Sequence, residues 1–163
     1  MSEINEYLKE AEVAVLTPAP TMLAETLTKV LADTVVFYFK AHSFHWNVTG
    51  SNFPQYHDFL GNVYEQVYGN VDRLAEEIRA LGEYAPRSLD ELFKSKTVDA
   101  DNVAKEPKEM IADLLIGNNQ TTETLNKLFD ELTAAKKQGF ANFVADRIDK
   151  QEKHAWMLKS LLK

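Results

Sequence analysis

The chain has 163 residues, of which 45% are hydrophobic and 26% charged, which suits one domain with one sizeable core. It has no cysteine, which excludes disulfides, zinc knuckles and thiol catalysis, so any metal site has to use histidine, carboxylate or backbone oxygen ligands. The net charge of -7 and the pI of about 5.1 disfavour binding to nucleic-acid phosphates, which requires clustered lysine and arginine.

Residues 1–20 are expected to form an N-terminal tail before a single domain of residues 21–163. Pro18 and Pro20 prevent a helix from running through this segment. The tail begins with acidic residues and lacks the basic start and long apolar stretch of a signal peptide. No run of about 18 apolar residues occurs in the chain, so we expect no membrane-spanning helix. A cytoplasmic location is the default that follows.

The first long helix is predicted over about 21–47. One stripe of residues at helical spacing begins at Leu23 and ends with His42 and His45. The middle of this helix, "VVFYF" at 35–39, is apolar on every side. Because a helix that is apolar all round is buried on more than one face, this segment indicates contacts beyond a single bundle.

A second helix is predicted over about 54–82, after a short turn. Its core stripe comprises Leu60, Val63, Val67, Val71, Leu74, Ile78 and Leu81. A second stripe comprises His57, Gly61, Glu65, Tyr68, Asp72 and Glu76. At about 100° per residue, Asp72 lies about 160° from Leu74, so its side chain is expected to point away from the core of the bundle.

The rest of the chain predicts one short helix and two long ones. The connection of residues 83–104 contains "SLDE" at 88–91, a capping-box pattern that predicts a short helix near 88–95. Helices follow at about 106–137 and 140–162. Two short connections therefore flank a long one. This order predicts an all-α, ferritin-like four-helix bundle whose long crossover carries a short helix.

Asp72 and Glu76 share one helix face, and with histidines nearby they form a hard oxygen-and-nitrogen set suited to Fe, Mn or Zn. The alternative is a solvated face balanced by Arg73 and Arg79, with the histidines packed as core residues. Within one bundle the histidines and the carboxylates face different ways. They could meet across a symmetric dimer contact, which would make residues 35–39 part of the interface.

The stretch "KAHSFHWNVTGSNFPQYHDFLGNVYEQVYGNVDRLAEEIRALG" at 40–82 resembles the Dps proteins, or mini-ferritins. The matching features are a His-Trp-Asn near a helix end, a second histidine twelve residues after the first, and an Asp-x-x-x-Glu pair. The short helix of the crossover and "EKHAWMLKSLL" at 152–162 agree with the same family. The resemblance spans about residues 21–162.

The resemblance implies a hollow homo-oligomer, in that family a dodecamer, that oxidises Fe(II) with hydrogen peroxide or dioxygen and stores the ferric product. It also implies ferroxidase sites shared between two subunits, with Zn or Mn as other metals for the same ligands. Carried over by position, the ligands are His45 and His57 of one subunit and Asp72 and Glu76 of its partner. Trp46 matches a residue whose role in that family is described as accepting oxidising equivalents. His42 would either orient a ligand or simply pack.

The sequence departs from the family pattern in three places. Gly61 stands where many members carry an acid, which affects a second iron position. Gln138 and Asn142 lie in the first turns of the last helix, where the family often has the acids that line iron-entry pores, and Asp146 and Asp149 are the candidates for this role here. The lysine-rich tail of DNA-condensing members is missing, so tight DNA binding is not expected. Two alternatives to an iron-oxidising shell are a nucleoid-condensing DNA-binding protein of the same fold and a structural shell with a silent metal site.

Overall fold

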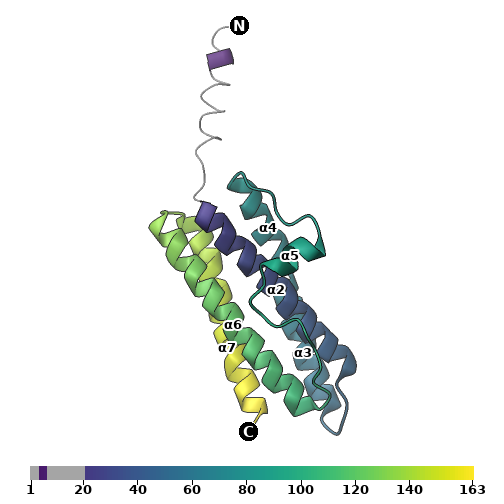
Figure 1. Ribbon diagram of the computed structural model, residues 1–163. Coiled ribbons are helices and arrows are strands. Elements are labelled where there is room, and N and C mark those ends of the chain that lie inside the picture. Colours follow the sequence, from purple (N-terminus) through teal and green to yellow (C-terminus); the bar gives the residue numbers. More distant parts are fainter. Residues whose placement is uncertain (1–3, 7–20) are drawn as a thin grey trace.

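The computed structural model describes residues 4–6 and 21–163, and the latter form a four-helix bundle with an additional short helix (Figure 1). The elements are α2 Thr21–Asn47, α3 Phe53–Tyr68, α4 Val71–Ala80, α5 Leu89–Lys94, α6 Pro107–Ala134 and α7 Gln138–Leu161. The predicted all-α, ferritin-like class is confirmed. The expected tail, apart from residues 4–6, lies outside the described residues.

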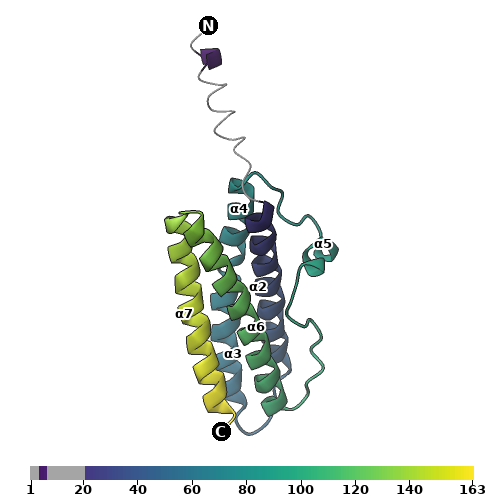
Figure 2. The same ribbon diagram turned by 60° about the vertical axis from the view of Figure 1, so that its left-hand side comes forward.

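The long helices run in the directions expected for a bundle with one long crossover (Figure 2). Helix α2 is antiparallel to the α3–α4 pair, and α6 is antiparallel to α7. The connection that carries α5 returns the chain along the side of the bundle, so α3 and α6 run parallel. Within residues 4–6 and 21–163, no helix is long and apolar enough to cross a membrane.

The core is divided into two apolar clusters along the bundle. One surrounds Leu27, Leu74 and Leu128, and the other surrounds Phe37, Leu60 and Leu114. The predicted core stripe of residues 60–81 is buried except for Val71, which is partly buried. The hydrophobic spacing therefore placed the inward faces of the helices correctly.

The prediction of one continuous helix over 54–82 was wrong, because the helix is interrupted at Gly69 and Asn70. The side-chain amide of Asn70 donates to the carbonyl oxygens of Gln66 (2.8 Å) and Val67 (3.1 Å). The Val67 carbonyl also accepts the backbone N–H of Asn70 over 3.1 Å, a three-residue bond that departs from the α-helical pattern. Glycine weakens a helix and asparagine competes for backbone hydrogen bonds, so this dipeptide allows the break.

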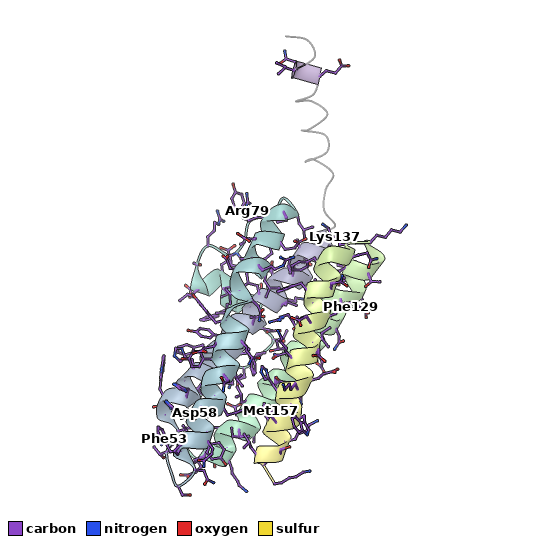
Figure 3. All side chains as sticks on the ribbon, turned by 180° about the vertical axis from the view of Figure 1, so that it is seen from behind. Phe53, Asp58, Arg79, Phe129, Lys137 and Met157 are labelled. Carbon is purple, nitrogen blue, oxygen red and sulfur yellow. The ribbon has the colours of Figure 1, made fainter. Side chains whose placement is uncertain are left out.

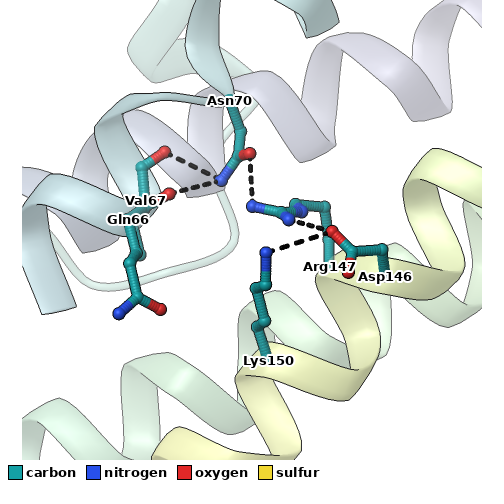
Figure 4. Close-up of polar contacts among 6 residues, drawn as sticks. All are labelled: Gln66, Val67, Asn70, Asp146, Arg147 and Lys150. Carbon is teal, nitrogen blue, oxygen red and sulfur yellow. Dashed lines mark hydrogen bonds and ion pairs between the residues drawn. The ribbon is translucent and has the colours of Figure 1, made fainter.

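The break is tied to the last helix. Nη1 of Arg147 on α7 donates to Oδ1 of Asn70 over 2.6 Å, as Figure 4 shows. The Asn70 side chain therefore uses both ends: its amide nitrogen holds the preceding turn of α3 and its oxygen binds α7. This contact fixes where α3 ends and α4 begins.

The crossover is held to the bundle by two charged side chains of α2. Asp33, which is fully buried, accepts hydrogen bonds from Thr97 and Val98 of the crossover and from Thr124 of α6. Lys40 is 1% exposed and binds the carbonyl of Asp101 as well as Asp113 of α6. Helix α5 begins as predicted, with the Ser88 side chain accepting from the Glu91 N–H.

Helix α6 ends three residues earlier than predicted, at Ala134. Lys136 adopts a left-handed conformation, with φ of 57°. The backbone N–H of Lys137 donates to the Leu132 carbonyl over 2.9 Å and that of Lys136 to Thr133 over 3.0 Å. This is the Schellman arrangement, in which glycine is the usual residue at the left-handed position.

Candidate metal centre

His45 near the end of α2 and His57 near the start of α3 bind each other's backbone. Nδ1 of His45 lies 2.8 Å from the His57 carbonyl oxygen, and Nδ1 of His57 lies 3.0 Å from the His45 carbonyl oxygen. Because a carbonyl oxygen only accepts, both Nδ1 atoms carry the proton and donate it. This tautomer places the Nε2 lone pair of each imidazole on the side away from these hydrogen bonds. Such backbone-oriented imidazoles are the usual form of metal-binding histidines.

The two imidazole rings are stacked, with centroids 3.7 Å apart and an interplanar angle of 22°. Phe53 packs against His57, with ring centroids 4.9 Å apart. The backbone of Gly61 lies beside His45, since a Cβ at this position would be 3.4 Å from Cε1 of the ring. A side chain at Gly61 would therefore lie directly against this histidine pair.

Aromatic side chains surround His42 on the same face of α2 and α3. Its ring stacks on Tyr64, with centroids 4.0 Å apart at 21°, and lies 4.2 Å from the ring of Trp46. Its Nδ1 is 3.1 Å from the hydroxyl oxygen of Tyr38. Burial lowers the pKa of His42, and the nearby His45 lowers it further. His42 is thus packed between aromatic rings next to the histidine pair.

Asp72 and Glu76 are exposed on α4 and lie away from the histidines of the same chain. Fifteen residues separate His57 from Asp72, which at about 1.5 Å per residue corresponds to roughly 20 Å along the α3–α4 pair. No group of three or more histidine, aspartate or glutamate side chains could hold a metal ion within the described part of one chain. The structure brings His45 and His57 together and leaves Asp72 and Glu76 elsewhere.

The face that carries the histidine pair is unusually aromatic for a surface. Phe39 is 49% exposed, Trp46 57% and Tyr68 60%. The Phe39 and Trp46 rings meet edge to face at 6.0 Å, and Tyr38 contacts Tyr68 at 5.0 Å. Large exposed apolar patches of this kind mark interaction surfaces. Tyr38 belongs to the predicted stripe that ends with His42 and His45. Tyr64 was not singled out from the sequence, although it follows His57 by seven residues and so shares its helix face.

The two pore candidates differ in their surroundings. The carboxylate of Asp146 is paired with Arg147 and, over 3.3 Å, with Lys150 (Figure 4). The hydrogen bond from Arg147 and then that from Lys150 lower the pKa of Asp146. Asp149 is exposed on the next turn of α7. A pore role for both remains a prediction, because it depends on neighbouring subunits.

The chain matches the ferritin-like domain over residues 24–163 and therefore belongs to the ferritin-like proteins. A DNA protection during starvation protein from Helicobacter pylori is 31% identical over 143 residues, which cover 85% of this chain and 96% of the relative. A protein of the same name from Brevibacillus brevis is 28% identical over 142 residues, covering 86% and 95%. Within the ferritin-like class, this chain is a member of the Dps family.

Solved Dps structures have the same fold. A Dps protein from Bacillus brevis superposes with a TM-score of 0.82 at 26% identity, covering 88% of this chain and 96% of that one. Dps from Staphylococcus aureus gives 0.82 at 25% identity, covering 90% and 99%. A Dps protein from Vibrio cholerae O1, described as a member of a broad superfamily of ferritin-like diiron-carboxylate proteins, gives 0.82 at 25% identity and covers 88% and 90%.

Proposed function

We propose that this protein is a ferroxidase and iron-storage mini-ferritin that oxidises Fe(II) at sites shared by two subunits. The observation that carries the proposal is the reciprocal hydrogen bonding of His45 and His57, which leaves both Nε2 lone pairs for a metal. Membership of the Dps family and the diiron-carboxylate superfamily of its Vibrio cholerae relative support iron as the substrate.

Asp72 and Glu76 of the partner subunit complete the proposed site. A symmetric dimer presents the same face twice, so the α4 carboxylates of each chain can meet the histidine pair of the other. The aromatic surface that includes Phe39 and Trp46 supports this face as the interface. Carboxylates and neutral imidazoles hold Fe(II) and leave coordination positions for the oxidant, and the carboxylate charge favours Fe(III).

The proposed reaction consumes two Fe(II) ions and one hydrogen peroxide, which with two protons give two Fe(III) ions and two water molecules. Because two Fe(II) ions together reduce one peroxide to water, the reaction avoids the hydroxyl radical that forms when a single Fe(II) reduces peroxide by one electron. Trp46, in contact with His42, is proposed to accept oxidising equivalents that escape the metal site. The ferric product would then be stored inside a homo-oligomeric shell, for which we propose the dodecamer of the family.

Gly61 limits the site. It lies against His45 but offers no carboxylate, so we propose that protein ligands hold one iron firmly and that water completes any second position. Zn or Mn could bind the same ligands.

Because the chain is acidic and its default location is the cytoplasm, we propose that protection from oxidation, and not DNA condensation, is the main role. The protein should therefore leave plasmid mobility unchanged in a gel shift at neutral pH and physiological salt.

Paired substitutions test the ligand assignment. Replacing both Asp72 and Glu76 by alanine should slow Fe(II) oxidation by peroxide, followed by ferric absorbance, to the protein-free rate. The matched control replaces Glu123 and Asp130, two exposed acids of α6, and changes the net charge equally. Particle mass should be unchanged in both variants. Unchanged turnover in the Asp72 and Glu76 variant would show that these carboxylates are not ligands.

Complementation tests whether the site is shared between subunits. A chain lacking Asp72 and Glu76 is co-expressed with a chain lacking His45 and His57. Each variant alone has no complete site, but random co-assembly at equal amounts restores about a quarter of the sites, because each half is intact with a probability of about one half. Recovery of about a quarter of the wild-type rate supports a shared site. No recovery from correctly assembled mixed particles would place the site within one chain.

A further inference from the structure

A groove of about 180 Å³ lies between α3 and α7, away from the histidine pair. Figure 3 shows the side of the molecule on which these two helices face the viewer, with Asp58 labelled on α3 and Met157 on α7. The groove is lined by Phe59, Asn62, Val63, Gln66, Lys153, His154 and Met157. Its polar groups are two amides, one ammonium group and one imidazole.

The one charged side chain in the lining of this groove is the cation Lys153, although the whole chain carries a net charge of -7. Lys153 forms no ion pair with any residue of the described chain. Lys150 and Arg147, about one and two turns earlier on α7 and outside the lining, share the carboxylate of Asp146 (Figure 4). Lys153 is therefore available to bind an anion in the groove.

No carboxylate belongs to the lining of the groove. On α3, Asp58 precedes Asn62 by one turn and Glu65 precedes Gln66, but neither belongs to the lining. On α7, Asp149 and Glu152 are exposed and also outside the lining. The charges that act on the imidazole of His154 come from Lys153, Arg147 and Lys150, all cationic.

His154 supplies a hydrogen-bond acceptor next to Lys153 in the lining of the groove. It is 5% exposed, and its Nδ1 lies 3.1 Å from Oε1 of Gln151, so Nδ1 donates and Nε2 keeps the lone pair. Burial, followed by the three neighbouring cations, lowers the pKa of His154 to about 4. The ring is therefore neutral at physiological pH and can accept, but not donate, a hydrogen bond through Nε2.

A polar atom without a hydrogen-bond partner lies in a small cavity that shares two lining residues with the groove. Gln66 and His154 also line a small inner cavity of about 20 Å³, which is large enough for about one water molecule. Arg147 lines the same cavity, and its buried Nε has no hydrogen-bond partner in the described part of the chain. A buried guanidinium nitrogen without an acceptor is costly, and a water that connects it to an anion in the groove would satisfy it.

We propose that this groove binds inorganic hydrogenphosphate. Lys153 and the amide groups of Asn62 and Gln66 supply the donors for the three unprotonated oxygens, as expected for phosphate recognition. His154 supplies the acceptor for the P–OH group. Sulfate has no proton at neutral pH and would leave this acceptor unpaired, so the site should prefer phosphate and arsenate to sulfate. The proposal is independent of the ferroxidase site and holds for the metal-free protein.

Titration calorimetry of the full-length, metal-free protein with sodium phosphate at neutral pH tests the proposal, with sodium sulfate titrated at the same ionic strength. We expect saturable phosphate binding and at least about tenfold weaker sulfate binding. Lys153→Gln, and separately Asn62→Asp, should each weaken phosphate binding by about tenfold or more. Lys159→Gln, an exposed lysine on the same helix, should leave it unchanged.

The selectivity is tested separately with His154→Gln, because the glutamine amide can donate to sulfate and should remove most of the preference for phosphate. No saturable phosphate binding, or sulfate binding of equal strength, would overturn the proposal. Equal weakening by the Lys159 and Lys153 substitutions would also overturn it, since this would indicate diffuse attraction. None of these measurements uses iron or an oxidant, so failure here leaves the ferroxidase proposal untouched.

Discussion

Asp33 should be the most sensitive polar residue of the scaffold. Its Oδ1 accepts the backbone N–H groups of Thr97 (2.5 Å) and Val98 (2.9 Å). Its Oδ2 accepts the hydroxyl groups of Thr97 (2.7 Å) and Thr124 (3.0 Å). One buried carboxylate thus joins α2, the crossover and α6. No ion pair involves Asp33 among the described residues, so these four donors alone compensate its charge.

Replacing Asp33 by alanine removes the acceptor of the two Thr97 groups and of the Val98 N–H, whereas the Thr124 hydroxyl keeps the Thr121 carbonyl, 3.1 Å away, as an acceptor. Thr97 is exposed, so water can satisfy its two groups, whereas Val98 is fully buried and Thr124 partly so. At about 1–3 kcal/mol for the buried Val98 N–H left without a partner, and about 0.5–1.5 kcal/mol for each hydrogen bond lost by Thr97 and Thr124, Asp33→Ala should lower the free energy of unfolding by about 3–4 kcal/mol. Asp33→Asn should cost only about 1–2 kcal/mol, because its oxygen still accepts both N–H groups and its amide can donate to the two hydroxyls.

Urea unfolding followed by circular dichroism at one fixed protein concentration measures both losses, since oligomerisation makes stability concentration-dependent. Hydrogen exchange of the Val98 amide reports the local effect. Asp130→Ala, at an exposed acid of α6, serves as the control and should change stability by less than about 0.5 kcal/mol. A loss below about 1 kcal/mol for Asp33→Ala, or equal losses for alanine and asparagine, would refute this account of how the crossover is held.

Two further changes concern the helix ends and pH. Lys136→Gly should raise the free energy of unfolding by about 0.5–1 kcal/mol, because glycine adopts the left-handed conformation at this C-cap without strain; a thermal shift downward would argue against it. Burial lowers the pKa of His154 from 6.5 to about 4. Between about pH 6.5 and 4 only the unfolded chain takes up this proton, so the free energy of unfolding should fall as the pH decreases through this range. The loss should reach about 3 kcal/mol and be absent in His154→Gln, measured by urea unfolding across this range in phosphate-free buffer; parallel pH curves for the two proteins would exclude it.

The candidate site could be predicted from the sequence only in part. The pattern of His45, His57, Asp72 and Glu76 was recognisable because its spacing resembles a known family, yet no local rule places these four side chains in one site. The reciprocal hydrogen bonds of the two histidines depend on how the turn between α2 and α3 brings both rings together. The carboxylate half of the proposed site depends on a second subunit, which a single chain cannot position.

The sequence by itself determined the helices and their inward faces, because apolar residues at three- and four-residue spacing and a capping serine act within a few residues of each other. Tertiary structure decided the break at Gly69–Asn70, which Arg147 stabilises from 77 positions along the chain. It also decided the attachment of the crossover to Asp33 and the groove between α3 and α7. Each of these depends on side chains that meet only after the helices pack, and their energies cannot be read from neighbours in sequence.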